Sequence, residues 1–202
     1  MRNSVPFPIV ISGPSGVGKT TLVDRLVASD DLLVESISTT TRVPREGEVS
    51  GVHYFFVERD VFERMKDREL VEWAEVHGMF YGTPRRFIDQ ELESGHDVVL
   101  NIDIQGGNSV KRAFPDAVMI FILPPSMDVL EERLRIRGDV DEAVIRRRVE
   151  AARGEITGSN NYSYLVVNDD LDRAETALRS IIEAERCRRE RIHPAALKQL
   201  GK

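Results

Sequence analysis

Short, uninterrupted apolar runs alternate with segments of helical spacing along most of the chain. The runs predict buried parallel strands, because a strand covered on both faces needs no polar alternation; they lie at 7–12, 98–102, 118–123 and 164–168. Each is followed by apolar residues three and four positions apart, which predict helices; these segments are 19–29, 105–113, 126–137 and 171–191. Strands that alternate with helices predict an α/β fold with helices on both faces of a parallel sheet.

Two stretches depart from this alternation. Segment 33–94 mixes short β-prone pieces with helical patterns and is punctuated by glycines; the β-prone pieces are 33–38, 53–57 and 70–76, and the helical patterns 60–68 and 84–93. We interpret it as an α+β subdomain inserted into a core formed by 1–32 and 95–202. Within that core, the Arg-rich segment 137–156 predicts a lid. The whole forms one domain of about 7–188.

Composition narrows the class of protein. The 202 residues carry a net charge of −6, which argues against general nucleic-acid binding and acidic membranes. No apolar run approaches the ~18 residues that span a bilayer, and nothing resembles an export signal. The single cysteine fits a reducing, cytoplasmic location. Of the 28 basic residues 23 are arginine, which suits bidentate binding of phosphate.

The strongest motif is a complete G-x-x-x-x-G-K-[ST] loop between a predicted strand and a predicted helix. Backbone N–H groups of such a loop and the helix N-terminus bind phosphate. Lys19 is expected to reach the β- and γ-phosphates, and the Thr20 hydroxyl to bind Mg²⁺. The sequence therefore predicts a nucleoside triphosphate here, held by Gly13, Pro14, Ser15, Gly16, Val17, Gly18, Lys19 and Thr20.

The loop alone does not separate kinases from GTPases or motors. A GTPase also carries an Asn-Lys-x-Asp motif that reads guanine, and this sequence has none. A short chain with an inserted subdomain favours a small nucleotide kinase.

Further motifs make the chain resemble a guanylate kinase from about 9 to 186. They are STTTRVPR with GE at 38–48, GVHYFF at 51–56, EWAE at 72–75, GMFYGT at 78–83, IDIQG at 102–106, PPS at 124–126, RG at 137–138 and VNDD at 167–170. The resemblance implies a P-loop core with a GMP-binding insertion and a lid. It also implies transfer of the γ-phosphoryl of Mg-ATP to GMP, with dGMP as a second acceptor, in purine metabolism and GMP recycling.

The resemblance assigns the insertion to the acceptor nucleotide. Arg42 and Arg45, three residues apart, can both fork onto one phosphate, and the resemblance places them on that of GMP, together with Tyr54 and Tyr81. Glu72 is expected to read the base, since one carboxylate accepts from both the N1–H and 2-amino groups of guanine. The remaining base contacts expected are Ser38, Thr83 and Asp103.

The lid is expected to complete the catalytic set. The resemblance brings Arg137 and Arg148 to the ATP phosphates, so that Lys19, Arg42, Arg137 and Arg148 act as the catalytic residues. It adds Thr21, Arg133 and Asn168 to the ATP site. One position departs from the family pattern: Asn101-Ile102-Asp103 stands where Asp-Ile-Asp is commoner, which leaves one carboxylate instead of two.

Three questions stay open at this point. Guanylate-kinase-like scaffold domains share the fold without catalysis, but they lack an intact loop and its lysine. A kinase for UMP, CMP or dTMP is a second alternative, and Glu72 with Ser38 and Thr83 argues against it. The segment 186–202 mixes arginines with apolar residues and is a candidate surface for a homo-oligomer, which the sequence does not decide.

Overall fold

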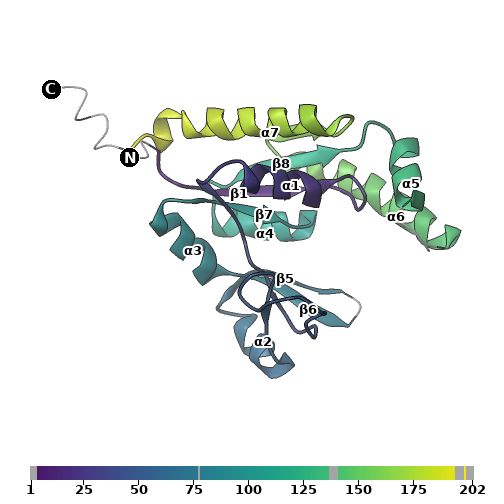
Figure 1. Cartoon of the computed structure of the whole chain (residues 1–202), viewed down its shortest axis with the longest axis horizontal. Coiled ribbons are helices and arrows are strands. Elements are labelled where there is room, and N and C mark those ends of the chain that lie inside the picture. The colour runs from purple at the N-terminus through teal and green to yellow at the C-terminus, as the bar shows by residue number, and fades with distance from the viewer. Residues whose placement is uncertain (1–3, 77, 137–140, 194–197, 199–202) are drawn as a thin grey trace.

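The computed structural model describes residues 4–76, 78–136, 141–193 and 198. Its larger sheet has five parallel strands in the order β2-β7-β1-β8-β9 (Figure 1). The strands are β1 Pro8–Ser12, β2 Leu33–Glu35, β7 Asp97–Asn101, β8 Val118–Leu123 and β9 Tyr164–Val167. The expected parallel sheet of an α/β fold is confirmed.

Helices cover both faces of this sheet, as β1 illustrates. Its residues point alternately to the two sides, so Ile9 and Ile11 join one apolar cluster and Val10 the other. The first cluster includes residues of α1, α5, α6 and α7, and the second includes residues of α3 and α4. The bounds are α1 Lys19–Ala28, α3 Arg85–Ser94, α4 Ile104–Ala113, α5 Met127–Ile136, α6 Glu142–Thr157 and α7 Leu171–Arg186.

A smaller sheet of four strands forms a separate layer, in the order β4-β3-β6-β5 (Figure 1). Its β6 runs antiparallel to both neighbours, and β3 pairs with β4 in parallel. Phe62 of α2 stacks on Phe80 of β6, with ring centroids 5.4 Å apart. The elements are β3 Thr39–Thr40, β4 Phe55–Phe56, α2 Arg59–Met65, β5 Leu70–Val76 and β6 Met79–Pro84.

The boundary between core and insertion differs from the expected one. Residues 33–35 were expected in the insertion, but they form β2, an edge strand of the core sheet, where Leu33 pairs with Asp97. At the other end, α3 packs on the core through the buried Ile88. The separate sheet and α2 therefore occupy only the interval from Thr39 to Pro84.

A buried ion-pair network stabilises the end of the sheet opposite the phosphate loop. Asp97 at the start of β7 is fully buried and accepts hydrogen bonds from Phe7 N, at 3.0 Å, and Arg186 Nε, at 2.9 Å. Arg186 also pairs with Asp30 at 2.7 Å. The network joins the last turn of α7 to β7, to the residue before β1 and to the loop after α1.

Helices α5 and α6 form an arm that extends beyond the sheet (Figure 1). Arg135 of α5 connects them through an ion pair with Glu142 of α6, at 3.1 Å, and also pairs with Glu131 of its own helix, at 2.6 Å. The connection between the two helices, 137–140, lies outside the described residues. Two single-turn 3₁₀ helices, Ser159–Asn161 and Arg189–Arg191, complete the elements.

Candidate active site

The predicted phosphate loop connects β1 to α1 at the carboxyl edge of the core sheet, where α/β folds bind ligands. Gly18 is the residue before the helix and has a φ of 98°, a conformation that favours glycine. A Cβ there would also lie 2.5 Å from Asn168 Nδ2. Both backbone conformation and space therefore require glycine at this position.

Asn168 supports the loop from behind. Its side chain is buried and donates from Nδ2 to Val17 O at 2.8 Å, while Arg133 donates from Nη2 to Asn168 O at 3.0 Å. Lys19 Nζ folds onto its own loop and donates to the carbonyl oxygens of Gly13 and Pro14. A phosphate that enters the loop offers this ammonium group a stronger, charged acceptor.

A cavity of about 510 Å³ opens in front of the loop. Most of the residues expected to bind ATP line it. Val17 of the loop is buried, Asn168 lies behind the loop, and Arg137 lies outside the described residues. The lining residues are Gly13, Pro14, Ser15, Gly16, Gly18, Lys19, Thr20, Thr21, Asn101, Ile102, Asp103, Arg133 and Glu155. We call it the donor cavity.

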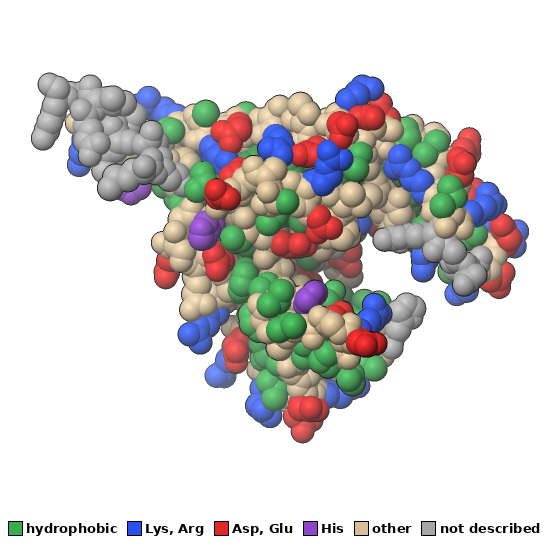
Figure 2. All heavy atoms as spheres, viewed as in Figure 1, with side chains coloured by type: hydrophobic (Ala, Val, Ile, Leu, Met, Phe, Trp, Pro, Cys, Tyr) green, Lys and Arg blue, Asp and Glu red, His purple; other side chains and the backbone are tan. Residues whose placement is uncertain are grey.

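A second cavity, of about 370 Å³, adjoins it and is called the acceptor cavity. The two share Thr20, Asn101 and Ile102 as lining residues. Figure 2 shows the hollow between the core and the smaller layer. The other residues that line the acceptor cavity are Glu35, Ser36, Ile37, Ser38, Glu48, Val52, His53, Tyr54, Thr83 and Leu100.

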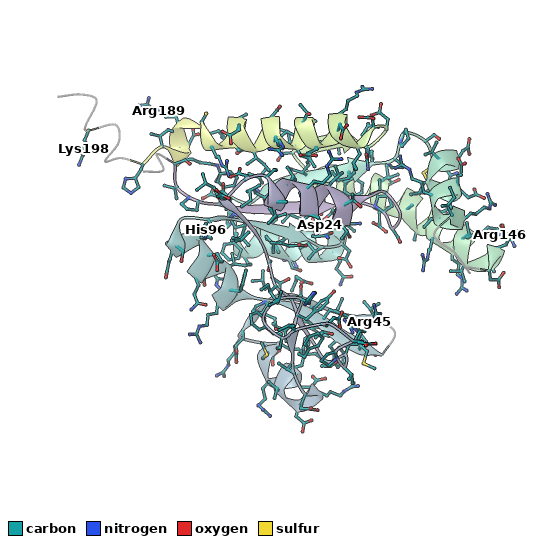
Figure 3. All side chains as sticks on the ribbon, viewed as in Figure 1. Asp24, Arg45, His96, Arg146, Arg189 and Lys198 are labelled. Carbon is teal, nitrogen blue, oxygen red and sulfur yellow. The ribbon has the colours of Figure 1, made fainter. Side chains whose placement is uncertain are left out.

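Arg42 and Glu48 form a two-armed ion pair beside the acceptor cavity, with N–O distances of 2.9 and 2.8 Å. The backbone N–H of Arg45 donates to the same carboxylate at 2.6 Å. These contacts hold the pKa of Glu48 down at about 2. The Arg45 side chain is exposed on the smaller layer (Figure 3).

Two tyrosines stand next to this pair. The Arg42 guanidinium lies 5.4 Å from the Tyr54 ring centroid, and Tyr81 meets Tyr54 edge-on at 6.0 Å. The structure thus brings three of the four residues expected at the acceptor phosphate into one cluster. An arginine over an aromatic face is held in place without losing its hydrogen-bonding edge.

Glu72 lies on β5 and faces the first turn of α4. The Thr83 hydroxyl of β6 donates to its carboxylate, and an added Cβ on Gly106 would lie 3.1 Å from Glu72 Oε2. Asp103 caps the same helix by accepting from Gly106 N at 2.7 Å. Burial, and then the negative charge of Asp103, raise the pKa of Glu72 above its usual value, against the hydrogen bond from Thr83.

Three carboxylates were not assigned roles from the sequence. Glu48 was recognised only as part of a motif, and its pairing with Arg42 became visible in the folded loop. Glu155 reaches the donor cavity from α6, where burial raises its pKa and the charge of Lys19 opposes that shift. Glu35 lines the acceptor cavity from β2. No local sequence pattern marks Glu35 or Glu155, because they reach the cavities from elements distant along the chain.

The lid residues are only partly described. Arg148 is exposed on α6 beside the equally exposed Arg146 and Arg147. Figure 3 shows Arg146 on the arm formed by α5 and α6. Arg148 lines neither cavity in this conformation. Its contact with ATP phosphates therefore stays a prediction that requires the arm to move.

Together these features join a P-loop and its cavity to a second cavity flanked by an arginine, the arrangement expected of a nucleoside monophosphate kinase. The family model for guanylate kinase matches residues 6–185. A guanylate kinase of Myxococcus xanthus (strain DK1622) is 51% identical over 191 residues, 94% of this chain and 91% of that protein. One of Bacillus subtilis (strain 168) is 46% identical over 194 residues, 95% of each chain.

A solved structure agrees with these sequence matches. The crystal structure of guanylate kinase from Anaplasma phagocytophilum has a TM-score of 0.73 at 34% identity, covering 96% of this chain and 93% of that one. This chain belongs to the guanylate kinase family. It is therefore an enzyme of the nucleoside monophosphate kinase class, and the family's known activity is phosphoryl transfer from ATP to GMP. Among the described residues, no helix is long and apolar enough to cross a membrane.

Proposed function

We propose that ATP binds in the donor cavity, GMP binds in the acceptor cavity, and the γ-phosphoryl group passes directly between them. The observation that carries this proposal is the common lining of the two cavities by Thr20, Asn101 and Ile102. Two nucleotides bound on either side of these residues have their phosphates adjacent. Direct in-line transfer needs that adjacency.

On the donor side, the loop N–H groups and Lys19 bind the ATP phosphates, and Thr21 and Arg133 line the same cavity. Arg148 and Arg137 join when the arm closes, which also excludes water that would hydrolyse ATP. Asn168 acts by holding the loop in its binding conformation, through the bond to Val17 O.

On the acceptor side, Arg42, Arg45, Tyr54 and Tyr81 bind the GMP phosphate. The carboxylate of Glu72 accepts hydrogen bonds from the N1–H and 2-amino groups of guanine, as it already does from the Thr83 hydroxyl. Further contacts to the base come from Ser38, Thr83 and Asp103. Adenine presents an N1 lone pair at the same place, which a carboxylate repels.

The chemical problem is charge, not proton removal. The acceptor phosphate is already an anion, so the reaction needs no general base. Two unit charges ~4 Å apart repel by about 4 kcal/mol at an effective dielectric of 20. Arg42, Arg148 and Lys19 offset that repulsion, and they stabilise the charge that develops on the transferred group.

The residues at the junction of the cavities fit Mg²⁺. At the junction Thr20 offers a hydroxyl and Asn101 a carboxamide, and Glu35 of the acceptor cavity offers a carboxylate; all are oxygen donors of the kind that this ion prefers. The described residues contain no group of three or more His, Cys, Asp or Glu that could hold a metal alone. That composition suits an ion that brings substrate phosphates and water as its other ligands. Bound there, Mg²⁺ neutralises phosphate charge.

We further propose dGMP as a second acceptor and the cytoplasm as the location. The base edge that Glu72 reads is identical in GMP and dGMP, so the proposed recognition does not depend on the 2′-hydroxyl. The single cysteine, Cys187, is exposed and forms no disulfide bond, which suits a reducing compartment. The enzyme then serves purine metabolism by returning GMP to the diphosphate pool.

A coupled assay of ADP formation tests the proposal. The purified chain is given Mg-ATP with GMP, dGMP, AMP, UMP, CMP or dTMP, and kcat/KM is compared. We expect turnover with the two guanine nucleotides at least about 100-fold above the others, since unmade buried hydrogen bonds discriminate strongly. Comparable turnover of a pyrimidine nucleotide would contradict the assignment. A Lys19→Met variant, inactive with every acceptor, controls for contaminating kinases.

A further inference from the structure

A buried tyrosine connects the base of the arm to the phosphate loop. Tyr162 follows the single-turn helix Ser159–Asn161, where the chain leaves α6, and it precedes β9. Its hydroxyl donates to Ser12 Oγ at 2.7 Å. Ser12 is the last residue of β1 and is fully buried next to Gly13, the first residue of the loop. Two segments 150 residues apart therefore meet at one hydrogen bond.

The hydrogen bonds continue from Ser12 to Asp103. Ser12 Oγ donates to the backbone carbonyl oxygen of Asp103 at 3.3 Å. Because a carbonyl oxygen can only accept, Ser12 must give its single proton there, and the Tyr162 hydroxyl must then be the donor to Ser12. Burial raises the pKa of Tyr162 to about 12, so this hydroxyl stays protonated at neutral pH. The chemistry of the groups thus fixes the direction of both bonds.

Asp103 in turn positions the first turn of α4. Its carbonyl oxygen also accepts from Gly107 N at 2.9 Å, and its carboxylate accepts from Gly106 N at 2.7 Å. This turn faces Glu72, since an added Cβ on Gly106 would lie 3.1 Å from Glu72 Oε2. A shift of Asp103 would therefore disturb the carboxylate proposed to read guanine as well as its own proposed contact with the base.

Helix α4 leaves space for the tyrosine hydroxyl. A Cβ on Gly107 would collide with the Tyr162 hydroxyl oxygen and would lie 3.3 Å from Ser12 Oγ. Inside a helix glycine is less favourable than any residue except proline, yet α4 has two glycines in succession, Gly106 and Gly107. The first leaves room for Glu72, and the second leaves room for the bond between Tyr162 and Ser12.

We propose that Tyr162 is a positioning residue for the acceptor site: through Ser12, its hydroxyl fixes the Asp103 carbonyl and with it the first turn of α4 beside Glu72. Without this hydroxyl, Ser12 loses the donor that sets its rotamer, and its proton is no longer directed to Asp103. GMP binding then weakens, while the loop keeps its own contacts with ATP. The inference rests on the proposed function, because it takes Glu72 and Asp103 to bind the guanine base.

The test compares KM for GMP with kcat. Tyr162→Phe removes only the hydroxyl and keeps the ring, which meets Phe121 edge-on with centroids 5.3 Å apart. We expect KM for GMP to rise about fivefold, the effect of one neutral hydrogen bond, while kcat and the Kd of a non-hydrolysable ATP analogue stay within about twofold. Tyr164→Phe is the matched control and should keep the wild-type KM, because the Tyr164 hydroxyl bonds Glu185 and this residue lines neither cavity.

A double variant tests whether the bonds act as one chain. Ser12→Ala removes the middle of the chain and should raise KM for GMP as much as Tyr162→Phe does. Combining the two should be no worse than either alone, since residues in one network are not additive. Thermal unfolding checks that each variant is folded.

Three results would overturn the proposal: a wild-type KM in Tyr162→Phe, additive losses in the double variant, or an equal loss of ATP affinity in Tyr162→Phe. A wild-type protein that does not phosphorylate GMP would contradict the proposed function, and this inference with it, before any variant is compared.

Discussion

The hydroxyl of Thr83 donates a hydrogen bond to the carboxylate of Glu72, joining the two antiparallel strands β5 and β6 at the position proposed to read the base. Of the forces on this carboxylate, burial raises its pKa, while the bond from Thr83 lowers it. The bond therefore helps to keep Glu72 ionised, which it must be to accept two hydrogen bonds from guanine.

This relationship predicts a shift in the pH dependence of GMP binding. As the pH falls, Glu72 loses its charge at a pH above the ordinary 4.5, and GMP affinity falls with it. Thr83→Val removes the bond that lowers this pKa, so the acid-side midpoint of the kcat/KM profile should move to higher pH. Thr83→Ser keeps the hydroxyl and should keep the wild-type midpoint. Coincident profiles for Val and wild type would show that the hydroxyl does not set this pKa.

Gly106 allows a prediction that separates stability from binding. Alanine suits a helix better than glycine by about 0.5–1 kcal/mol, but at 106 its Cβ would lie 3.1 Å from Glu72 Oε2. Gly106→Ala should therefore raise KM for GMP several-fold without loss of thermal stability. Gly154→Ala is the matched control, because nothing lies within 4 Å of its Cβ. If both variants keep the wild-type KM, Gly106 is not needed to seat Glu72.

Arg148 is predicted to act on the transition state. Arg148→Ala should lower kcat by about 100-fold or more, because arginines that stabilise phosphoryl transfer contribute at least that much. Binding of GMP alone, measured by calorimetry, should change little. Arg146→Ala removes the same charge from the same exposed helix and should leave kcat within a few-fold of the wild type. A normal turnover number in Arg148→Ala would refute the role.

The buried Asp97–Arg186 pair predicts a large effect on stability. Asp97→Ala leaves the Arg186 guanidinium without its most buried partner and the Phe7 N–H without an acceptor. Breaking a buried pair costs roughly 3–5 kcal/mol, which urea denaturation would detect as a lower free energy of unfolding. KM for GMP should not change in the folded fraction, because the pair lies at the opposite end of the strands from the loop. A loss below about 1 kcal/mol would mean that the network is dispensable.

Much of the core could be predicted because each element carries a local signal. The continuous apolar runs identify β1, β7, β8 and β9, and the glycine motif identifies the loop. Strand β6 has no such signal, since it contains Gly82. The structure gives a reason for that glycine: a Cβ there would lie 2.8 Å from Leu70 Cδ1 on the neighbouring β5.

Partnerships across the sheet could not be read from the sequence. Three residues of β2 pair with β7, and their place in the core depends on contacts with a strand far along the chain. The same holds for the bond between Asn168 and Val17 behind the loop. The motifs thus predicted which residues gather at the site, while the folded chain determined which side chain orients which.

The central claim is that Glu72 selects guanine at the acceptor site, and one comparison of Glu72→Gln with Glu75→Gln tests it most directly. Glu75 lies on the same strand and is exposed. We expect Glu72→Gln to lower kcat/KM for GMP by about 100-fold or more. The Kd for ATP should stay within about twofold, because the substitution removes a contact to GMP and not to ATP. Glu75→Gln should match the wild type in both measurements. Unchanged GMP kinetics in Glu72→Gln would contradict the account.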